Sequence, residues 1–197
     1  MIAVGLLQKG QLVAFPTDTV YGLGCSPFNP TSLEYIYEVK QRPEEKAIPV
    51  LISNLDQLAL VVSGITDAAR ALMNAFWPGP LTLILPRKQS LPSQLSPFPG
   101  LAVRMPRHNF ALRLLETAGP LAVTSANLSS HNNALSAQDV FEQLNTRIPL
   151  ILDDCSQPGG QASTVVDCLN DEPILLREGP IAFGKITEKW NTHVPNG

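Results

Sequence analysis

The segment that decides the fold has the sequence Phe15-Pro16-Thr17-Asp18-Thr19-Val20-Tyr21-Gly22-Leu23-Gly24. It begins where an apolar run ends, continues through three short polar side chains, and closes on two glycines that let a backbone bend or a ligand approach closely. Two interpretations stay open on these residues alone. They form either a tight turn held by local Asp and Thr hydrogen bonds or one wall of a binding cleft at the end of a strand.

Outward from this segment, short apolar runs alternate with helical patterns, which predicts an α/β domain. Three expected helices are preceded by N-cap residues, which are Asn54, Thr66 and Ser136. Ser136 together with Asp139 resembles a capping box. The expected helices are Thr31–Gln41, Leu55–Val61, Asp67–Phe76, Phe110–Thr117 and Ala137–Leu144. The expected strands are Leu12–Phe15, Ile48–Ile52, Leu81–Leu85, Leu101–Met105, Leu121–Thr124, Leu150–Leu152, Thr164–Asp167 and Ile174–Arg177.

Three segments fit neither pattern and are expected to be long loops: Pro86–Gly100, Asn127–Leu135 and Asp154–Ser163. Loops of this length inside a compact domain are often lids or binding loops. We expect one catalytic domain over residues 1–186 and a C-terminal tail over residues 187–197, of which the end looks frayed.

The composition excludes several classes of protein. The 197 residues are 44% hydrophobic and 16% charged, as in an ordinary globular domain. No apolar run approaches the roughly 20 residues that cross a bilayer, and the first residues lack a basic signal-peptide region, so we expect a cytoplasmic protein without a membrane partner. Cys25, Cys155 and Cys168 are widely spaced, which argues against a metal site or a disulfide framework.

Cationic side chains stand at the ends of several expected elements. Lys40 continues the apolar face of its helix, and its charge could complement the helix dipole, reach water, or face a cleft. Arg104 and Arg177 each close an expected strand. With Arg42 and Lys46, these residues could bind a triphosphate, although the whole chain carries a net charge of −3.

A further polar segment, Thr124-Ser125-Ala126-Asn127, leaves an apolar strand at its carboxyl end. Ligands of open α/β sheets bind outside such ends, although a plain polar turn explains the same residues. The common nucleotide and hydrolase motifs are absent: there is no Gly-x-x-x-x-Gly-Lys-Ser/Thr loop, no Gly-x-Gly-x-x-Gly fingerprint and no Gly-x-Ser-x-Gly elbow. His108 is best explained as a solvated helix cap.

The chain resembles the YrdC/TsaC family, the threonylcarbamoyl-AMP synthases that begin threonylcarbamoyl-adenosine synthesis in tRNA. The resemblance runs from Gly10 to about Gly184, and the family hallmark Lys-x-Arg…Ser-x-Asn falls on Lys40, Arg42, Ser125 and Asn127. The other matching motifs are Phe15–Gly24, Lys40-Gln41-Arg42-Pro43 with Lys46, Trp77-Pro78-Gly79-Pro80-Leu81-Thr82, Val103-Arg104-Met105-Pro106, Thr124–Asn127, Ser163-Thr164-Val165-Val166-Asp167 and Leu176-Arg177-Glu178-Gly179.

The resemblance implies a twisted, largely open mixed α/β sheet curved around a basic cavity, in the short single-domain form of the family. It implies an L-threonylcarbamoyladenylate synthase that uses L-threonine, bicarbonate and ATP. Mg²⁺ would be carried with the ATP, because we see no dedicated carboxylate cage. A downstream tRNA-modifying transferase complex would take the product onward.

The resemblance also assigns roles to single residues. Lys40 and Arg42 would be catalytic, meeting bicarbonate and phosphate oxygens. Threonine would be bound by Thr17, Arg104 and Thr164. ATP would be bound by Arg42, Lys46, Ser125, Asn127, Ser163 and Arg177. No protein-held metal is expected.

Two positions depart from the family pattern: Leu51, where some relatives carry a histidine that faces the amino acid, and Asn133, where many carry a serine near the nucleotide. The competing hypothesis is an RNA-binding module without catalysis, since the family looks able to present a basic concave face and weak RNA binding is possible. The acidic net charge and the lack of interleaved aromatic and basic residues weigh against it. A third hypothesis, a hydrogenase-maturation or carbamoyl-phosphate-processing domain, belongs to larger proteins with additional zinc-finger regions.

Overall fold

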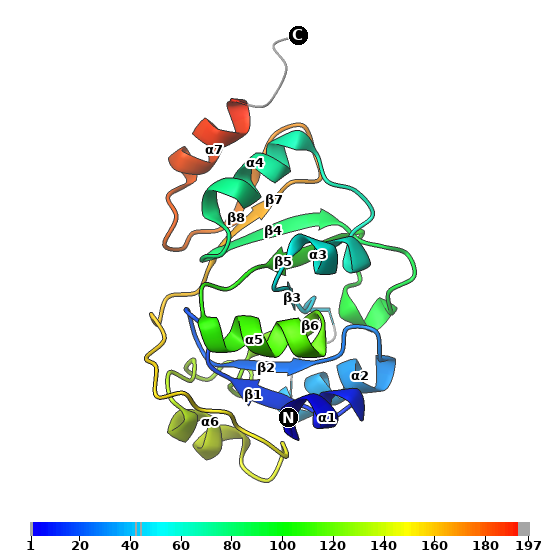
Figure 1. Cartoon of the computed structure of the whole chain (residues 1–197), viewed down its shortest axis with the longest axis vertical. Coiled ribbons are helices and arrows are strands. Elements are labelled where there is room, and N and C mark those ends of the chain that lie inside the picture. The colour runs from blue at the N-terminus through cyan, green and yellow to red at the C-terminus, as the bar shows by residue number, and fades with distance from the viewer. Residues whose placement is uncertain (1, 42, 44, 193–197) are drawn as a thin grey trace.

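The computed structural model describes residues 2–41, 43 and 45–192 (Figure 1). One mixed sheet of eight strands runs through it in the order β1-β2-β6-β3-β5-β4-β7-β8. The strands are β1 (Val13–Phe15), β2 (Gly22–Cys25), β3 (Val50–Leu51), β4 (Leu81–Pro86), β5 (Gly100–Arg104), β6 (Leu121–Ser125), β7 (Thr164–Asp167) and β8 (Ile174–Arg177). Only the pairs β3–β5 and β4–β7 are parallel. The open mixed α/β sheet expected from the sequence is therefore confirmed.

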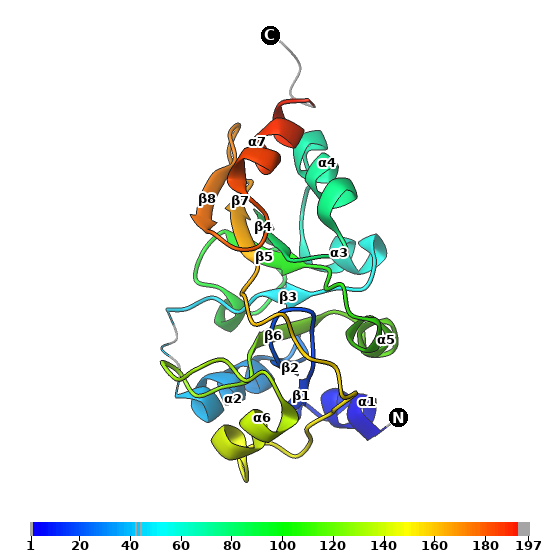
Figure 2. The same ribbon diagram turned by 90° about the vertical axis from the view of Figure 1, so that its left-hand side faces the viewer.

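The helices cover both faces of this sheet. They are α1 (Ile2–Gln8), α2 (Pro30–Lys40), α3 (Leu55–Val61), α4 (Asp67–Phe76), α5 (Asn109–Ala118), α6 (Ala137–Leu144) and α7 (Phe183–Asn191), with a short 3-10 helix at Ser93–Leu95. In the edge-on view of Figure 2, α2 lies on one side of the sheet, and α1 and α5 lie on the other. None of the helices in the described ranges is long and apolar enough to span a membrane.

The buried side chains form two clusters that match this arrangement. A smaller cluster joins α1 and α5 to one face of β1 and β6, through residues such as Leu7, Phe15 and Leu115. The larger cluster gathers the inward faces of the other helices, among them Leu33 and Ile36 of α2. Burial of these apolar faces is the main stabilising contribution to the fold.

The local end signals of the helices are confirmed. Asn54, Thr66 and Ser136 accept hydrogen bonds from the backbone N–H groups of Gln57, Ala69 and Asp139, and the last of these belongs to a complete capping box. A cap fixes the start of a helix through contacts within three residues, so it can be recognised without tertiary information.

Strand β2 contains both glycines of the opening segment, for which the sequence had left a tight turn and a cleft wall as alternatives. Glycine suits these two strand positions because neighbouring side chains leave no room for a Cβ atom. A Cβ at Gly22 would come within 2.6 Å of Val123 Cγ1, and one at Gly24 within 2.9 Å of Phe15 Cε1. The glycines therefore let β1 and β6 pack their side chains across β2.

Two other segments differ from expectation. The strand expected at Leu150–Leu152 is reduced to a single bridge between Ile151 and Ala14 of β1, because Asp153 and Asp154 then accept backbone N–H bonds from residues two positions on and turn the chain away. Helix α7 continues beyond residue 186, and its Trp190 is 2% exposed. The packed part of the chain therefore extends past the expected domain boundary.

Candidate active site

A cavity of about 380 Å³ opens where β5, β6 and β7 meet the Thr17–Gly22 segment. Its walls combine hydroxyl groups and two guanidinium groups with a floor of small apolar side chains. The lining residues are Thr17, Thr19, Val20, Gly22, Ala47, Pro49, Leu51, Thr82, Ala102, Arg104, Val123, Thr124, Ser125, Asn133, Ala162, Ser163, Val165 and Arg177. This size and mixture suit a small polar ligand.

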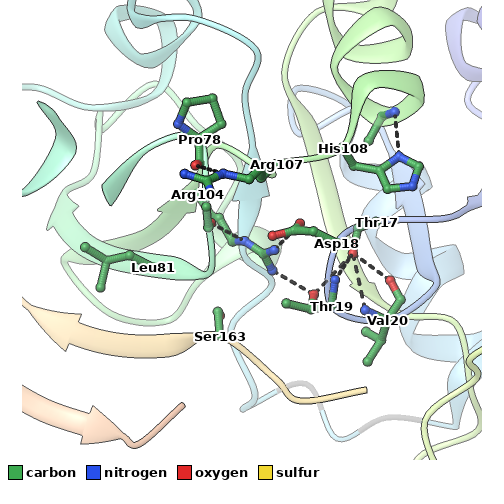
Figure 3. A network of polar contacts seen from close by, with 12 residues as sticks. Thr17, Asp18, Thr19, Val20, Pro78, Leu81, Arg104, Arg107, His108 and Ser163 are labelled. Atoms are coloured by element: carbon green, nitrogen blue, oxygen red, sulfur yellow. Dashed lines mark hydrogen bonds and ion pairs between the residues drawn. The ribbon is translucent and has the colours of Figure 1, made fainter. Parts of the chain in front are cut away.

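Arg104 is the most firmly held cation of the cavity, and it is only 6% exposed. Its Nε donates to Gly79 O at 3.0 Å, its Nη1 donates to Thr19 Oγ1 at 2.8 Å, and its Nη2 donates to Asp18 Oδ1 in an ion pair (Figure 3). Burial lowers the pKa of Arg104, and the Asp18 carboxylate acts in the opposite direction. Three bonds leave further N–H groups of this guanidinium for a ligand.

Arg177 comes from the edge strand β8 and is held by Ser163, the residue that precedes β7. Its Nε donates to Ser163 O at 3.0 Å and its Nη2 donates to Ser163 Oγ at 3.1 Å. Ser163 Oγ in turn lies 2.7 Å from Thr82 Oγ1 of β4. Among the described residues, no carboxylate forms an ion pair with Arg177. Its charge therefore faces the cavity without an acidic partner in that part of the chain.

Lys40 is buried beside the Ser125–Asn127 segment and does not line the cavity. Its exposed fraction is 1%, and its ammonium donates to Ser125 O at 2.5 Å and to Asn127 O. Asn127 donates its amide nitrogen to Leu128 O and His131 O, while its Oδ1 is buried without a partner among the described residues. Lys40 thus fixes the course of the Ser125–Asn127 segment through these two carbonyl groups.

We call residues 153–163 the strap, because they cross the Thr17–Tyr21 segment on the way to β7. Gly159 N donates to Asp18 O at 3.1 Å and Gly160 N donates to Thr19 O at 2.8 Å. Gly160 has a φ of 76°, which favours glycine at that position. The strap ends in Ala162 and Ser163, so its course decides where two lining residues stand.

Two side-chain contacts tie the beginning of the strap to the body of the protein. Tyr21 donates its hydroxyl to Asp153 Oδ1 at 2.9 Å, and burial together with this bond raises the pKa of Tyr21. His108 Nε2 lies 2.8 Å from Ser156 Oγ, while its Nδ1 accepts from Ala111 N as the N-cap of α5. The expected cap role of His108 is therefore confirmed, but its side chain is 10% exposed and bound to the strap.

The structure brings together five of the predicted site residues, and four described ones lie elsewhere. Those that line the cavity are Thr17, Arg104, Ser125, Ser163 and Arg177. Lys40, Lys46, Asn127 and Thr164 do not line it, and Arg42 lies outside the described residues. Thr164 is fully buried on the other side of β7, where its hydroxyl donates to Ile181 O at 2.9 Å and accepts from Ile181 N. Ser163, the residue before β7, thus lines the cavity, whereas the hydroxyl of Thr164 is used inside the protein.

Sequence reasoning gave no role to Asp18, Thr19 or Thr82. Asp18 and Thr19 belong to the segment that opened the sequence analysis, but nothing local shows that Arg104, 86 and 85 residues away, would be their partner. The two positions that depart from the family pattern, Leu51 and Asn133, both line the cavity. A basic cavity remains a prediction, because one of its two lining arginines is already paired with Asp18.

No group of three or more potential metal-ligating side chains occurs among the residues that the structure describes, and no carboxylate lines the cavity there. A Mg²⁺ ion held by protein carboxylates does not fit this set of residues. A Mg²⁺ ion that arrives on the phosphates of a nucleotide would need none of them.

Comparisons with known proteins found a family model, curated relatives and solved structures that are similar to this chain. The family model Sua5_yciO_yrdC, whose description is "Telomere recombination", matches residues 5–179. The "Threonylcarbamoyl-AMP synthase" of Bacillus subtilis (strain 168) is 42% identical over 190 residues, which cover 93% of this chain and 54% of the relative. The protein of the same name from Pyrococcus abyssi (strain GE5 / Orsay) is 38% identical over 187 residues, which cover 94% and 55%.

Among solved structures, "Crystal structure of P. abyssi Sua5 complexed with L-threonine" superposes with a TM-score of 0.91 at 38% identity, covering 95% of this chain and 56% of that one. The chain thus spans about half the length of these curated relatives.

Proposed function

The chain belongs to the Sua5/YciO/YrdC family, and on this premise we propose that it is an L-threonylcarbamoyladenylate synthase. It converts L-threonine, bicarbonate and ATP to threonylcarbamoyl-AMP and pyrophosphate, the first step of threonylcarbamoyladenosine formation in tRNA. The observation that carries the proposal is the pair of guanidinium groups, Arg104 and Arg177, on one cavity that no described carboxylate lines. Each of the three substrates carries a carboxylate, a carbonate oxygen or phosphates, which guanidinium groups bind well.

The proposed reaction has two steps. The amine of threonine attacks bicarbonate and forms a carbamate with loss of water, or it attacks carbon dioxide derived from bicarbonate and forms the same carbamate with loss of a proton. A carbamate oxygen then attacks the α-phosphorus of ATP, and the bond from that phosphorus to the bridging oxygen breaks, so pyrophosphate leaves. No protein nucleophile is needed, and the work of the protein is to hold anionic reactants together and offset charge at phosphorus.

The geometry supports a division of roles among the lining residues. Arg104 binds the threonine carboxylate with the N–H groups that its three protein contacts leave over. Thr17 shapes the wall beside it, since its hydroxyl donates to Val20 O at 2.7 Å. Ser125, Ser163 and Arg177 contact the nucleotide.

Of the remaining predicted residues, those that the structure describes act from outside the lining. Lys40 positions Ser125 and Asn127 through their carbonyl groups, and Thr164 anchors β7 to Ile181. Arg42 and Lys46 meet bicarbonate and phosphate oxygens. Mg²⁺ comes with ATP, and the product passes in the cytoplasm to a tRNA-modifying transferase complex. A non-catalytic RNA-binding module is not favoured, since the curated relatives carry the name of an enzyme.

The proposal is tested by incubating the purified chain with ATP, bicarbonate and each amino acid in turn, with pyrophosphate release and the mass of the adenylate as readouts. We expect product only when threonine, bicarbonate and ATP are all present. In Arg177→Gln the KM for ATP should rise about tenfold, because a charge-assisted contact is lost. The matched variant Arg113→Gln changes an exposed arginine of α5 and should behave as wild type. Pyrophosphate release that ignores threonine would contradict the proposal.

A further inference from the structure

Asp18 forms an ion pair with the Arg104 guanidinium beside the cavity. Arg104 lines the cavity, whereas Asp18 is not among the lining residues. The Asp18 side chain is 15% exposed, and its Oδ1 accepts from Arg104 Nη2. In Figure 3 the carboxylate and the guanidinium face each other beside Thr19. The ion pair and the two other protein contacts of Arg104 use three of its N–H groups, so further N–H groups remain for a ligand of the cavity that Arg104 lines.

The main chain of Asp18 is held as firmly as its side chain. The carbonyl of Asp18 accepts from Gly159 N at 3.1 Å, and the carbonyl of Thr19 accepts from Gly160 N at 2.8 Å. A Cβ at Gly159 would lie 3.2 Å from Asp18 O, so the strap approaches this peptide closely. The strap thus fixes two of the three residues that accept hydrogen bonds from the guanidinium.

Arg104 needs such support because it is a buried cation beside another one. Burial lowers its pKa, and the nearby charge of Arg177 lowers it further, while Asp18 opposes both effects. Without the carboxylate, a buried guanidinium would keep only Gly79 O and Thr19 Oγ1 as protein acceptors. Removing one partner of a buried ion pair leaves the other charge uncompensated and free to reorient.

We propose that Asp18 is a positioning residue for the amino-acid substrate: it holds the Arg104 guanidinium in the orientation that presents its remaining N–H groups to the substrate carboxylate. The inference rests on the proposed function and adds a residue to it. A rival role has the opposite consequence. If Asp18 instead competed with the substrate carboxylate for Arg104, its removal would tighten substrate binding.

The test compares Asp18→Asn with wild type in the threonine-dependent assay. Asn keeps the size and one acceptor oxygen but loses the charge. We expect the KM for threonine to rise about tenfold, with the KM for ATP unchanged, because Arg177 and Ser163 are untouched. Asp18→Glu restores the charge and should recover part of the loss. Asp171→Asn, at an exposed aspartate in the turn between β7 and β8, is the matched control and should match wild type.

The outcomes separate this inference from the proposed function. A wild-type chain without threonine-dependent turnover contradicts the function itself. An active wild type with an unchanged or lower threonine KM in Asp18→Asn overturns the positioning role, and equal increases in both KM values do so as well. Should Asp18→Asn fail to fold, Thr19→Ala removes the Nη1 acceptor of the same guanidinium and must raise the threonine KM in the same selective way.

Discussion

Tyr21 donates its hydroxyl to Asp153 Oδ1 at 2.9 Å across a separation of 132 residues. The same tyrosine donates its backbone N–H to Ala134 O, and its carbonyl accepts from Ala126 N. One residue of the opening segment therefore fixes the strap through its side chain and the 126–134 loop through its main chain. Both segments reach the cavity, so Tyr21 links two of the three long loops that the sequence predicts.

Replacing Tyr21 by Phe should loosen the strap without disturbing the core. The ring stays buried, and the exposed Asp153 can turn to water, so the free energy of unfolding should fall by only about 1 kcal/mol. The amides of Gly159 and Gly160 should exchange hydrogen faster, because the strap opens locally more often. Urea unfolding and hydrogen exchange measure the two effects. Tyr35→Phe, which removes a 2.8 Å bond to Arg147 O away from the strap, is the control. If the amides of Gly159 and Gly160 exchange hydrogen at the wild-type rate in Tyr21→Phe, the bond from Tyr21 to Asp153 does not hold the strap.

Replacing Lys40 by Met should be costly, although the two side chains are similar in size. The ammonium donates hydrogen bonds to the carbonyls of Ser125 and Asn127 inside the protein, and Met would leave both carbonyls without these bonds. We expect a loss of about 2–6 kcal/mol in the free energy of unfolding, since each of the two unsatisfied groups costs about 1–3 kcal/mol. Urea denaturation measures the change. The exposed Lys9→Met serves as the control, and equal losses in the two variants would contradict the role of Lys40.

The two buried thiols should make the fold sensitive to alkaline pH. Burial raises the pKa of Cys25 and of Cys168 from 9.0 to about 12. The stabilisation is complete below pH 9.0 and is lost as the pH rises toward 12, because in that window the unfolded chain has released protons that the folded chain retains. Each thiol should contribute a slope of about −1.4 kcal/mol per pH unit in the free energy of unfolding.

Urea unfolding between pH 8.5 and about 10.5 measures this slope. It should be smaller in Cys25→Ala than in wild type. Cys155→Ala removes an exposed cysteine and should keep the wild-type slope. If Cys25→Ala unfolds with the wild-type pH dependence, burial of that thiol does not contribute as described.

The sequence by itself determined what depends on near neighbours. The caps at Asn54, Thr66 and Ser136 set the starts of α3, α4 and α6 through contacts three residues away. The apolar spacing of α2 put Lys40 on its inward face, and that side chain is buried. Alternation of apolar runs was enough to predict an α/β sheet, because burial of one face is a property of each segment alone.

Only the tertiary structure decided the partners. Gly22–Cys25 becomes a strand because β1 and β6 pair with it. The sequence does not predict this strand, since glycine has a low β propensity and two of its four residues are glycines. Ser163 reaches the cavity while the hydroxyl of Thr164 bonds to Ile181, a residue that follows β8 and lies 17 positions along the chain. Arg104 meets Asp18 across 86 residues. Such pairings form only when the chain folds and brings distant segments together. A local sequence pattern cannot predict them, because it depends only on interactions between near neighbours.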